Sequence, residues 1–152
     1  MRAVFVDSNI LIYSQDATDS RKRAQAKHWL EQLWRTRSGR ISYQVLREVY
    51  VNVTRKVSNP LPAARARTLI RLFLAWNPRP EDSEFFEVAW EVETRSRLSW
   101  WDSMIVAAAH LSRCQFLLTE DLQDRMHLSG MIVIDPFSTS WEAFAQESES
   151  SA

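Results

Sequence analysis

The chain has 152 residues, 45% of them hydrophobic, and its 19 Lys and Arg residues balance 19 Asp and Glu residues. This length suits one domain with its own hydrophobic core. A single cysteine excludes a disulfide framework within the chain, three scattered histidines give no zinc spacing, and two glycines exclude a glycine-rich phosphate loop. No apolar run reaches the ~18 residues of a membrane span, so we expect a soluble protein, and the single cysteine makes a reducing cytoplasm the expected compartment.

The first elements in chain order alternate between strand and helix. Ala3–Val6 is a short apolar run, typical of a strand buried on both faces of a parallel sheet. A short helix is expected to begin near Ile10, and a longer one to cover residues 20–37. Gly39 is predicted to break that helix, and Ile41 to form a short strand or bridge.

The rest of the chain continues this alternation. Ser42 fits the N-cap of a helix through about Lys56, and Asn59-Pro60 marks a turn. The remaining predicted elements are helices at 63–76 and 82–96, a helix from Ser99 to about His110, and buried strands at 116–118 and 131–134.

This order of elements predicts an α/β fold: a three-layer domain with a central, mostly parallel sheet flanked by helices. We expect the domain to cover residues 1–140. Residues 141–152 form a C-terminal tail that is Ser- and Glu-rich from Glu147 and is expected to be partly disordered.

The balanced total charge conceals two halves of opposite sign. Residues 1–79 hold 15 Lys and Arg against 5 Asp and Glu (+10), whereas residues 80–152 hold 4 against 14 (−10). A basic half beside an acidic pocket would suit contact with a phosphate backbone. Solvated helix faces explain the same pattern equally well.

Four acids lie at the boundaries of the predicted elements: Asp7 and Asp121 after strands, Glu48 on the edge of a helix, and Asp102 at a helix start. Each has a structural alternative. Asp7 fits an N-cap, Ser99 with Asp102 fits a capping box, Asp121 can cap a turn after Thr119, and Glu48 can simply be solvated. Ligands of an open α/β sheet gather at the carboxyl ends of its strands, where Asp7 and Asp121 fall.

The chemistry of these four acids, taken together, favours a divalent-metal site. Carboxylate oxygens from separate segments suit Mg²⁺ or Mn²⁺, and such sites are used for metal-assisted phosphodiester hydrolysis. Four adjacent carboxylates repel one another unless a cation neutralises them. Neutralisation by a nearby arginine such as Arg47 is the competing explanation.

The order of these residues resembles the PIN-domain family and, within it, the VapC-type toxins of bacterial and archaeal toxin–antitoxin modules. The likeness runs from residue 3 to about residue 137. It rests on Val6-Asp7-Ser8-Asn9, Glu48 in the helix after Ser42, Asp102 with Ala107, Thr119-Glu120-Asp121, and Ile134-Asp135-Pro136-Phe137.

This resemblance implies an endoribonuclease that uses Mg²⁺ or Mn²⁺. On this hypothesis Asp7 and Asp102 hold the metal directly, and Glu48 and Asp121 complete the site directly or through water. Asn9 and Thr119 are expected to orient carboxylates or water. The implied partners are an RNA substrate, a cognate antitoxin protein that inserts a segment into the acidic groove, and a second copy of the chain in a homodimer.

One position departs from the family pattern. Asp124 stands where the family often has an aromatic or aliphatic residue, so Glu120, Asp121 and Asp124 are all candidates to face the metal, and the T-x-D match favours Asp121. A rival interpretation is a non-catalytic PIN-like module that binds RNA or protein. A phosphatase of the haloacid dehalogenase type is disfavoured because Asn9 replaces its second acid, and a receiver domain because no lysine follows the last strands.

Overall fold

A five-stranded sheet forms the centre of the fold in the computed structural model, which describes residues 2–150. The strand order is β2-β1-β3-β5-β4, and only β4 is antiparallel to its neighbour. The strands are β1 (Val4–Val6), β2 (Gly39–Arg40), β3 (Phe116–Leu118), β4 (His127–Leu128) and β5 (Met131–Ile134). The mostly parallel α/β sheet predicted from the sequence is confirmed.

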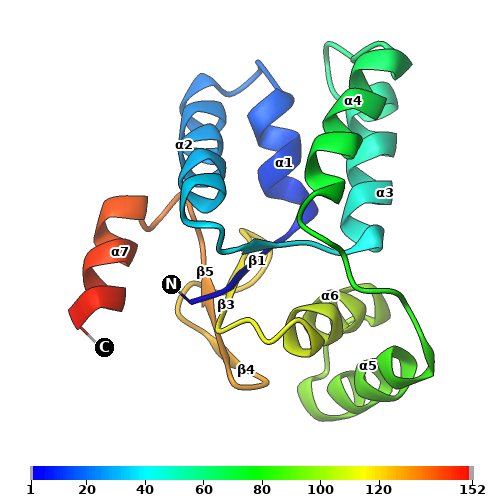
Figure 1. The fold of residues 1–152 in the computed structure, drawn as a ribbon, viewed down its shortest axis with the longest axis vertical. Coiled ribbons are helices and arrows are strands. Elements are labelled where there is room, and N and C mark those ends of the chain that lie inside the picture. The colour runs from blue at the N-terminus through cyan, green and yellow to red at the C-terminus, as the bar shows by residue number, and fades with distance from the viewer. Residues whose placement is uncertain (1, 151–152) are drawn as a thin grey trace.

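Helices surround this sheet (Figure 1), with α1 to α4 gathered above it, α5 and α6 below it, and α7 beside α2. Their bounds are α1 (Ser8–Gln15), α2 (Ser20–Thr36), α3 (Tyr43–Val51), α4 (Ala63–Leu74), α5 (Ser83–Ser96), α6 (Trp100–Leu111) and α7 (Trp141–Ser150). A π-helical turn, η1 (Asn52–Lys56), extends α3. No described helix is long and apolar enough to cross a membrane.

The strands that carry the candidate acids are buried on both faces, as their sequences predict. Every residue of β1 and β3 is buried, because helices cover both sides of a parallel sheet. Val6 of β1 lies opposite Leu118 of β3, and the Asp7 amide donates to the Leu118 carbonyl at 3.0 Å. The residues that follow the two strands therefore meet at one edge of the sheet.

Two early elements begin at residues other than those predicted. Helix α1 begins at Ser8 rather than near Ile10, because the Asp7 carboxylate accepts a hydrogen bond from the Ser8 amide and caps the helix. Strand β2 forms at Gly39 and not at Ile41, since Gly39 pairs with Val4. Helix α2 already ends at Thr36, where Arg37 adopts a left-handed conformation.

The C-terminal segment differs from the expectation of partial disorder. Residues Trp141–Ser150 form α7, which packs against α2 and buries Trp141 and Phe144. These two rings contact Trp29 of α2 with centroid separations of 5.3 and 5.2 Å, so aromatic burial outweighs the polar composition of the following residues. Residues 151–152 lie outside the described part of the chain.

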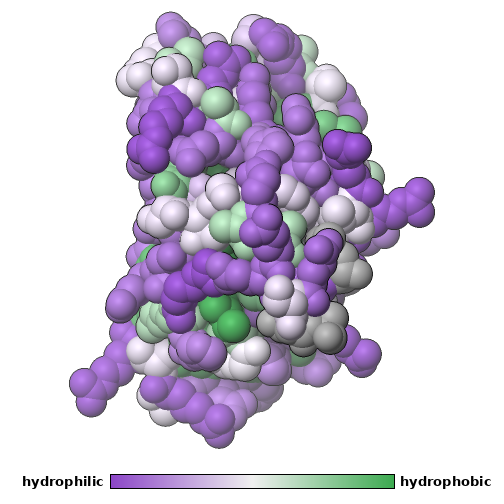
Figure 2. Space-filling view, turned by 90° about the vertical axis from the view of Figure 1, so that its left-hand side faces the viewer, coloured by the Kyte–Doolittle hydropathy of each residue, from purple (hydrophilic) through white to green (hydrophobic). Residues whose placement is uncertain are grey.

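Figure 2 shows the face of the molecule on the α7 side, which is mostly hydrophilic with hydrophobic residues in small separate areas.

Gly39 supports a testable prediction about the packing of β2. A Cβ atom at this position would lie 2.6 Å from Cζ2 and 2.7 Å from Cζ3 of Trp76, a buried ring packed against Trp34 and Phe73. We expect Gly39→Ala to lower the free energy of unfolding by about 1–3 kcal/mol, the usual cost of overpacking. Urea unfolding would measure this loss. The same change in a Trp76→Leu background should cost less, and an equal cost in both backgrounds would contradict the collision.

Candidate metal centre

Asp7 is the most deeply placed of the candidate acids. It follows β1 directly, and only 6% of its surface is exposed. Its Oδ1 accepts from the Ser8 amide at 2.7 Å, and its Oδ2 accepts from the Thr119 hydroxyl at 2.8 Å. Its N-cap role and its place at the site are therefore compatible, because the two contacts use different oxygens.

Asn9 and Thr119 connect Asp7 to Asp121 across the carboxyl ends of β1 and β3. Nδ2 of Asn9 donates to Oδ2 of Asp121 at 3.1 Å and to the Thr119 hydroxyl oxygen at 3.2 Å. The Asp121 amide also donates to this hydroxyl, at 3.1 Å. The side-chain oxygen of Asn9, Oδ1, is buried and has no hydrogen-bond partner among the described residues. The site thus contains a buried polar atom with unused bonding capacity.

Glu48 reaches the same region from α3. The Ser8 hydroxyl donates to its Oε2 at 2.7 Å, and Nε2 of Gln44 donates to its Oε1 at 3.2 Å. Sequence analysis assigned no role to Ser8 or Gln44. The available signals were the position of Ser8 directly after Asp7 and the four-residue spacing of Gln44 and Glu48, which puts them on one helix face.

Asp102 is not joined directly to the other three acids. It lies in the first turn of α6, where its amide donates to the Ser99 hydroxyl at 3.1 Å. Within residues 2–150 its carboxylate has no hydrogen-bond or ion-pair partner. Its link to the rest of the site is indirect: Nε2 of Gln44, which also donates to Glu48, donates to the Trp101 carbonyl at 3.3 Å. The structure therefore links Asp7, Glu48 and Asp121 to one another through Ser8, Asn9 and Thr119, and it links Asp102 to them only through the Gln44 contact to the Trp101 carbonyl.

The other two acids after β3 are engaged elsewhere. Glu120 pairs with Lys22 of α2 at 2.8 Å. Asp124 accepts from the Asp135 amide at 2.8 Å and so holds the segment after β5. Of the three candidates, only Asp121 contacts Asn9.

The electrostatics of this region favour the binding of a cation. Burial, and secondarily the charges of Asp121 and Glu48, raise the pKa of Asp7 from 3.8 to about 6, against the lowering effect of its two hydrogen bonds. Among the described residues no Lys, Arg or His pairs with any of the four acids, and Arg47 pairs instead with Glu81 at 3.1 Å. Neutralisation by Arg47, the competing explanation, is therefore wrong.

Two observations test whether the residues fit Mg²⁺ or Mn²⁺. The donor set consists only of oxygen atoms, as these ions prefer, and it includes the unused Oδ1 of Asn9. Over the described part of the chain, no three His, Cys, Asp or Glu side chains already stand close enough together to hold an ion. The oxygen donors and the uncompensated negative charge therefore fit Mg²⁺ or Mn²⁺. Side chains would have to move to complete the ligand set, and the mutual repulsion of carboxylates without a cation would explain why they stand apart.

The raised pKa of Asp7 predicts how stability depends on pH without metal. Because the folded-state pKa, about 6, exceeds 3.8, ionised Asp7 opposes folding; the penalty grows as pH rises from about 4 to 6 and is complete above that. The pKa difference corresponds to about 3 kcal/mol, and the Thr119 hydrogen bond lost in Asp7→Asn offsets about 1 kcal/mol. At pH 7.5 in EDTA, Asp7→Asn should therefore be more stable than wild type by about 2 kcal/mol.

Urea unfolding at pH 4 and pH 7.5 would measure this effect. At pH 4 the advantage of Asp7→Asn should vanish, because Asp7 is then largely protonated in the folded wild type. An Asp7→Asn protein that is less stable than wild type at both pH values would contradict the assigned electrostatics.

Comparison with known proteins gives one family and several related folds. The family described as "PIN domain" matches residues 4–125. Among curated proteins, none matches the sequence significantly.

Three solved structures illustrate the likeness. VapC20 of Mycobacterium tuberculosis, described as a sarcin-ricin loop cleaving toxin, has a TM-score of 0.57 and 25% identity, over 76% of this chain and 87% of that one. A toxin-antitoxin complex from Klebsiella pneumoniae has a TM-score of 0.57 and 24% identity, over 88% and 97%. DNA-bound VapBC from Salmonella typhimurium has a TM-score of 0.62 and 17% identity, over 90% and 99%. At identities below 25%, the last two structures show only that the fold is similar.

Proposed function

The chain belongs to the PIN-domain family, and from this premise we propose that it is a metal-dependent endoribonuclease, the toxin of a type II toxin–antitoxin module. The observation that carries the proposal is that Asp7, Glu48 and Asp121 are linked through Ser8, Asn9 and Thr119 while no Lys, Arg or His among the described residues pairs with them. Asp7 and Asp121 are 114 positions apart in the chain, and neither strand needs an acid at its end in order to pair.

The chain's residues would act mainly by holding oxygen atoms in place. Asp7, Glu48 and Asp121, with Asp102, would hold Mg²⁺ or Mn²⁺, which when bound lowers the pKa of a water and offsets charge that develops on the phosphate. The Thr119 hydroxyl and the Ser8 amide each fix one oxygen of Asp7. Such bonds orient the carboxylate and favour its ionised form against the opposing effect of burial.

The remaining contacts orient the other two acids. Asn9 fixes one oxygen of Asp121, and its own Oδ1, which has no hydrogen-bond partner among the described residues, is free to accept a hydrogen bond or to face a cation. Ser8 and Gln44 fix both oxygens of Glu48. The described histidines contact other parts of the chain or solvent: His28 pairs with Glu142, and His110 lies near the Ser129 carbonyl. Carboxylates are thus the proton acceptors the site offers.

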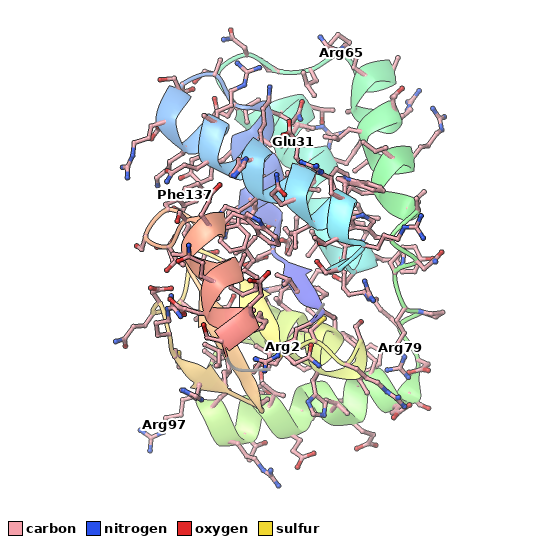
Figure 3. The ribbon with its side chains drawn as sticks, turned by 60° about the vertical axis from the view of Figure 1, so that its left-hand side comes forward. Arg2, Glu31, Arg65, Arg79, Arg97 and Phe137 are labelled. Atoms are coloured by element: carbon pink, nitrogen blue, oxygen red, sulfur yellow. The ribbon has the colours of Figure 1, made fainter. Side chains whose placement is uncertain are left out.

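RNA is the proposed substrate because of the family and the distribution of charge. VapC20, 25% identical, is described as cleaving the sarcin-ricin loop. The basic half supplies arginines that would contact a phosphate backbone, although they do not form one compact patch: Figure 3 shows Arg65 at the top of the molecule and Arg2 well below it, in the lower half of the view. Contacts to RNA would therefore come from several separate basic residues.

The proposed protein partners are a cognate antitoxin and a second copy of the chain. The fold is similar to that of a toxin-antitoxin complex from Klebsiella pneumoniae, which supports an antitoxin whose segment enters the acidic site. A homodimer is proposed from the family resemblance. Exposed hydrophobic residues on α4 and α5, Leu72, Leu74, Phe86 and Trp90, would suit such a contact.

One observation favours the alternative of a non-catalytic PIN-like binding module. The Asp102 carboxylate is not in contact with the other three acids, and no ready-made set of three ligands is present among the described residues. In that case the acids would serve only as caps and hydrogen-bond acceptors. Metal-dependent turnover distinguishes the two functions.

Incubation of the purified protein with total RNA tests the proposal. Wild type and Asp102→Asn would be compared with Mg²⁺, with Mn²⁺ and with EDTA, after circular dichroism has verified that both are folded and gel electrophoresis that both are free of antitoxin. Discrete fragments from wild type with metal, absent with EDTA and with Asp102→Asn, are the expected result. Folded wild type that cleaves no RNA under any of these conditions would favour the binding module.

A further inference from the structure

Two consecutive acids after β3 point to different parts of the molecule. Asp121 contacts Asn9 of α1 at the candidate metal centre, whereas Glu120 turns to α2 and accepts from Nζ of Lys22 at 2.8 Å. Lys22 and Glu120 are 98 positions apart. The direction of Glu120 restricts that of Asp121, because one peptide unit joins them in the bend after β3 and the Asp121 amide is itself held by the Thr119 hydroxyl at 3.1 Å.

Lys22 is held by more than its carboxylate partner. Its Nζ lies 4.7 Å from the ring centroid of Tyr13 and 5.0 Å from that of Phe137, and it is 3.4 Å from the Tyr13 hydroxyl. The two rings pack edge to face with centroids 5.1 Å apart. Phe137 lies between β5 and α7, next to α2 (Figure 3). Lys22 therefore lies against two aromatic rings, the Tyr13–Phe137 seat, of which Tyr13 belongs to α1 and Phe137 to the segment after β5.

Partial burial distinguishes this pair from an ordinary surface ion pair. The side chains of Lys22 and Glu120 are 29% and 21% exposed, whereas exposed pairs contribute little to stability. Cation–π contacts strengthen when the cation is shielded from water. The pair and its seat thus join α1, α2 and the segments after β3 and β5 at one point, next to Asp121.

We propose that Lys22 is a positioning residue of the candidate metal centre: held against the Tyr13 and Phe137 rings, it pairs with Glu120 and so fixes the backbone that directs Asp121 toward Asn9. This inference rests on the proposed function and adds a residue to it. Lys22 does not contact the candidate ligands itself. Its effect on cation binding passes through Glu120 and the backbone between residues 119 and 121.

Substitutions of Lys22 and Glu120 test this coupling through Mn²⁺ binding and metal-dependent cleavage. Lys22→Met keeps the aliphatic stem and removes the charge, and Glu120→Gln removes the partner's charge. We expect each to raise the dissociation constant for Mn²⁺ about tenfold, the scale of one lost hydrogen bond between charged groups. The kcat at saturating metal should stay within about twofold of wild type, because the ligands themselves are unchanged.

Three further variants separate this role from a general loss of charge. The double variant Lys22→Met/Glu120→Gln should bind Mn²⁺ no more weakly than either single variant, because the two residues act as one unit. Lys22→Arg should restore near-normal binding, since a guanidinium can pair with Glu120 and stack on Tyr13. Lys27→Met, which removes a charge from an exposed position of the same helix, should bind Mn²⁺ like wild type.

Three outcomes would overturn the proposal. They are unchanged Mn²⁺ binding in Lys22→Met, additive effects in the double variant, and a loss confined to the KM for RNA with a reduced salt dependence. The last would instead make Lys22 a phosphate contact.

Amide hydrogen exchange keeps this test independent of the proposed function. The Asp121 amide donates to the Thr119 hydroxyl, so its exchange in metal-free protein reports the order of this segment. Lys22→Met should speed that exchange, and Lys27→Met should leave it unchanged. Wild type that binds no Mn²⁺ and cleaves no RNA would remove the proposed function, whereas unchanged exchange in Lys22→Met would remove the positioning role.

Discussion

Replacing Asp7 by Asn is expected to lower metal-dependent RNA cleavage about 10³-fold, the scale seen when a group that stabilises transition-state charge is removed. Asp7 is buried, both of its oxygens are held, and the charges of Asp121 and Glu48 both act on it. Asn keeps the shape of the side chain but not its charge. The loss should therefore appear in kcat/KM, measured on a defined RNA, while the protein stays folded.

Asp124→Asn is the matched control for this substitution. Asp124 lies three positions after Asp121, but its carboxylate accepts from the Asp135 amide, and an Asn side-chain oxygen can accept the same bond. Cleavage by Asp124→Asn should thus remain within a few-fold of wild type. Wild-type cleavage by Asp7→Asn, or an equal loss in both variants, would contradict the assignment of Asp7 to the site.

Replacing Phe144 by Ala is expected to lower the free energy of unfolding by about 3–5 kcal/mol, the usual cost of removing a buried aromatic ring. Phe144 is 2% exposed and lies between Trp29 of α2 and Phe116 of β3, with centroid separations of 5.2 and 4.8 Å. Its loss would leave a cavity where α7 joins the rest of the domain. Urea unfolding monitored by far-ultraviolet circular dichroism would measure the change.

Phe86→Ala provides the comparison for Phe144→Ala. Phe86 is 41% exposed on α5, and its ring contacts Trp90 and Trp100 at the surface. Its truncation should cost less than about 1 kcal/mol, as is usual for exposed positions. If Phe144→Ala were as mild as Phe86→Ala, α7 would not be part of the folded core, and the sequence-based expectation of a disordered tail would be restored.

Periodicity and residue type were sufficient to predict most of the elements. The apolar runs at β1, β3 and β5 predicted buried parallel strands because strands covered by helices on both faces need no polar side. Helices α3 and α6 were predicted from Ser42 and Ser99, and both hydroxyls do accept the capping bond, from Val45 and Asp102. Strand β4, only two residues long, was not predicted because so short a segment has no readable periodicity.

The elements missed or misplaced depend on contacts between distant residues. Helix α7 ends in Ser and Glu residues that suggest disorder, but its Trp141 and Phe144 pack against Trp29, more than 100 positions earlier in the chain. The pairing of Gly39 with Val4 decides where β2 lies, and no local pattern reveals that register.

The sequence by itself determined the side chains from which a metal site is proposed: four acids at element boundaries, with oxygen as the only kind of donor, and no histidine or cysteine set for another metal. Only the tertiary structure decided how the acids are used. It directs Glu120 to Lys22 and Asp124 to the Asp135 amide, leaves Asp121 facing Asn9, and pairs Arg47 with Glu81 rather than with the acidic cluster. The physical reason is that charge and ligand type are properties of residues, whereas the partner that each carboxylate meets depends on which distant segments the packing of the sheet and helices brings together.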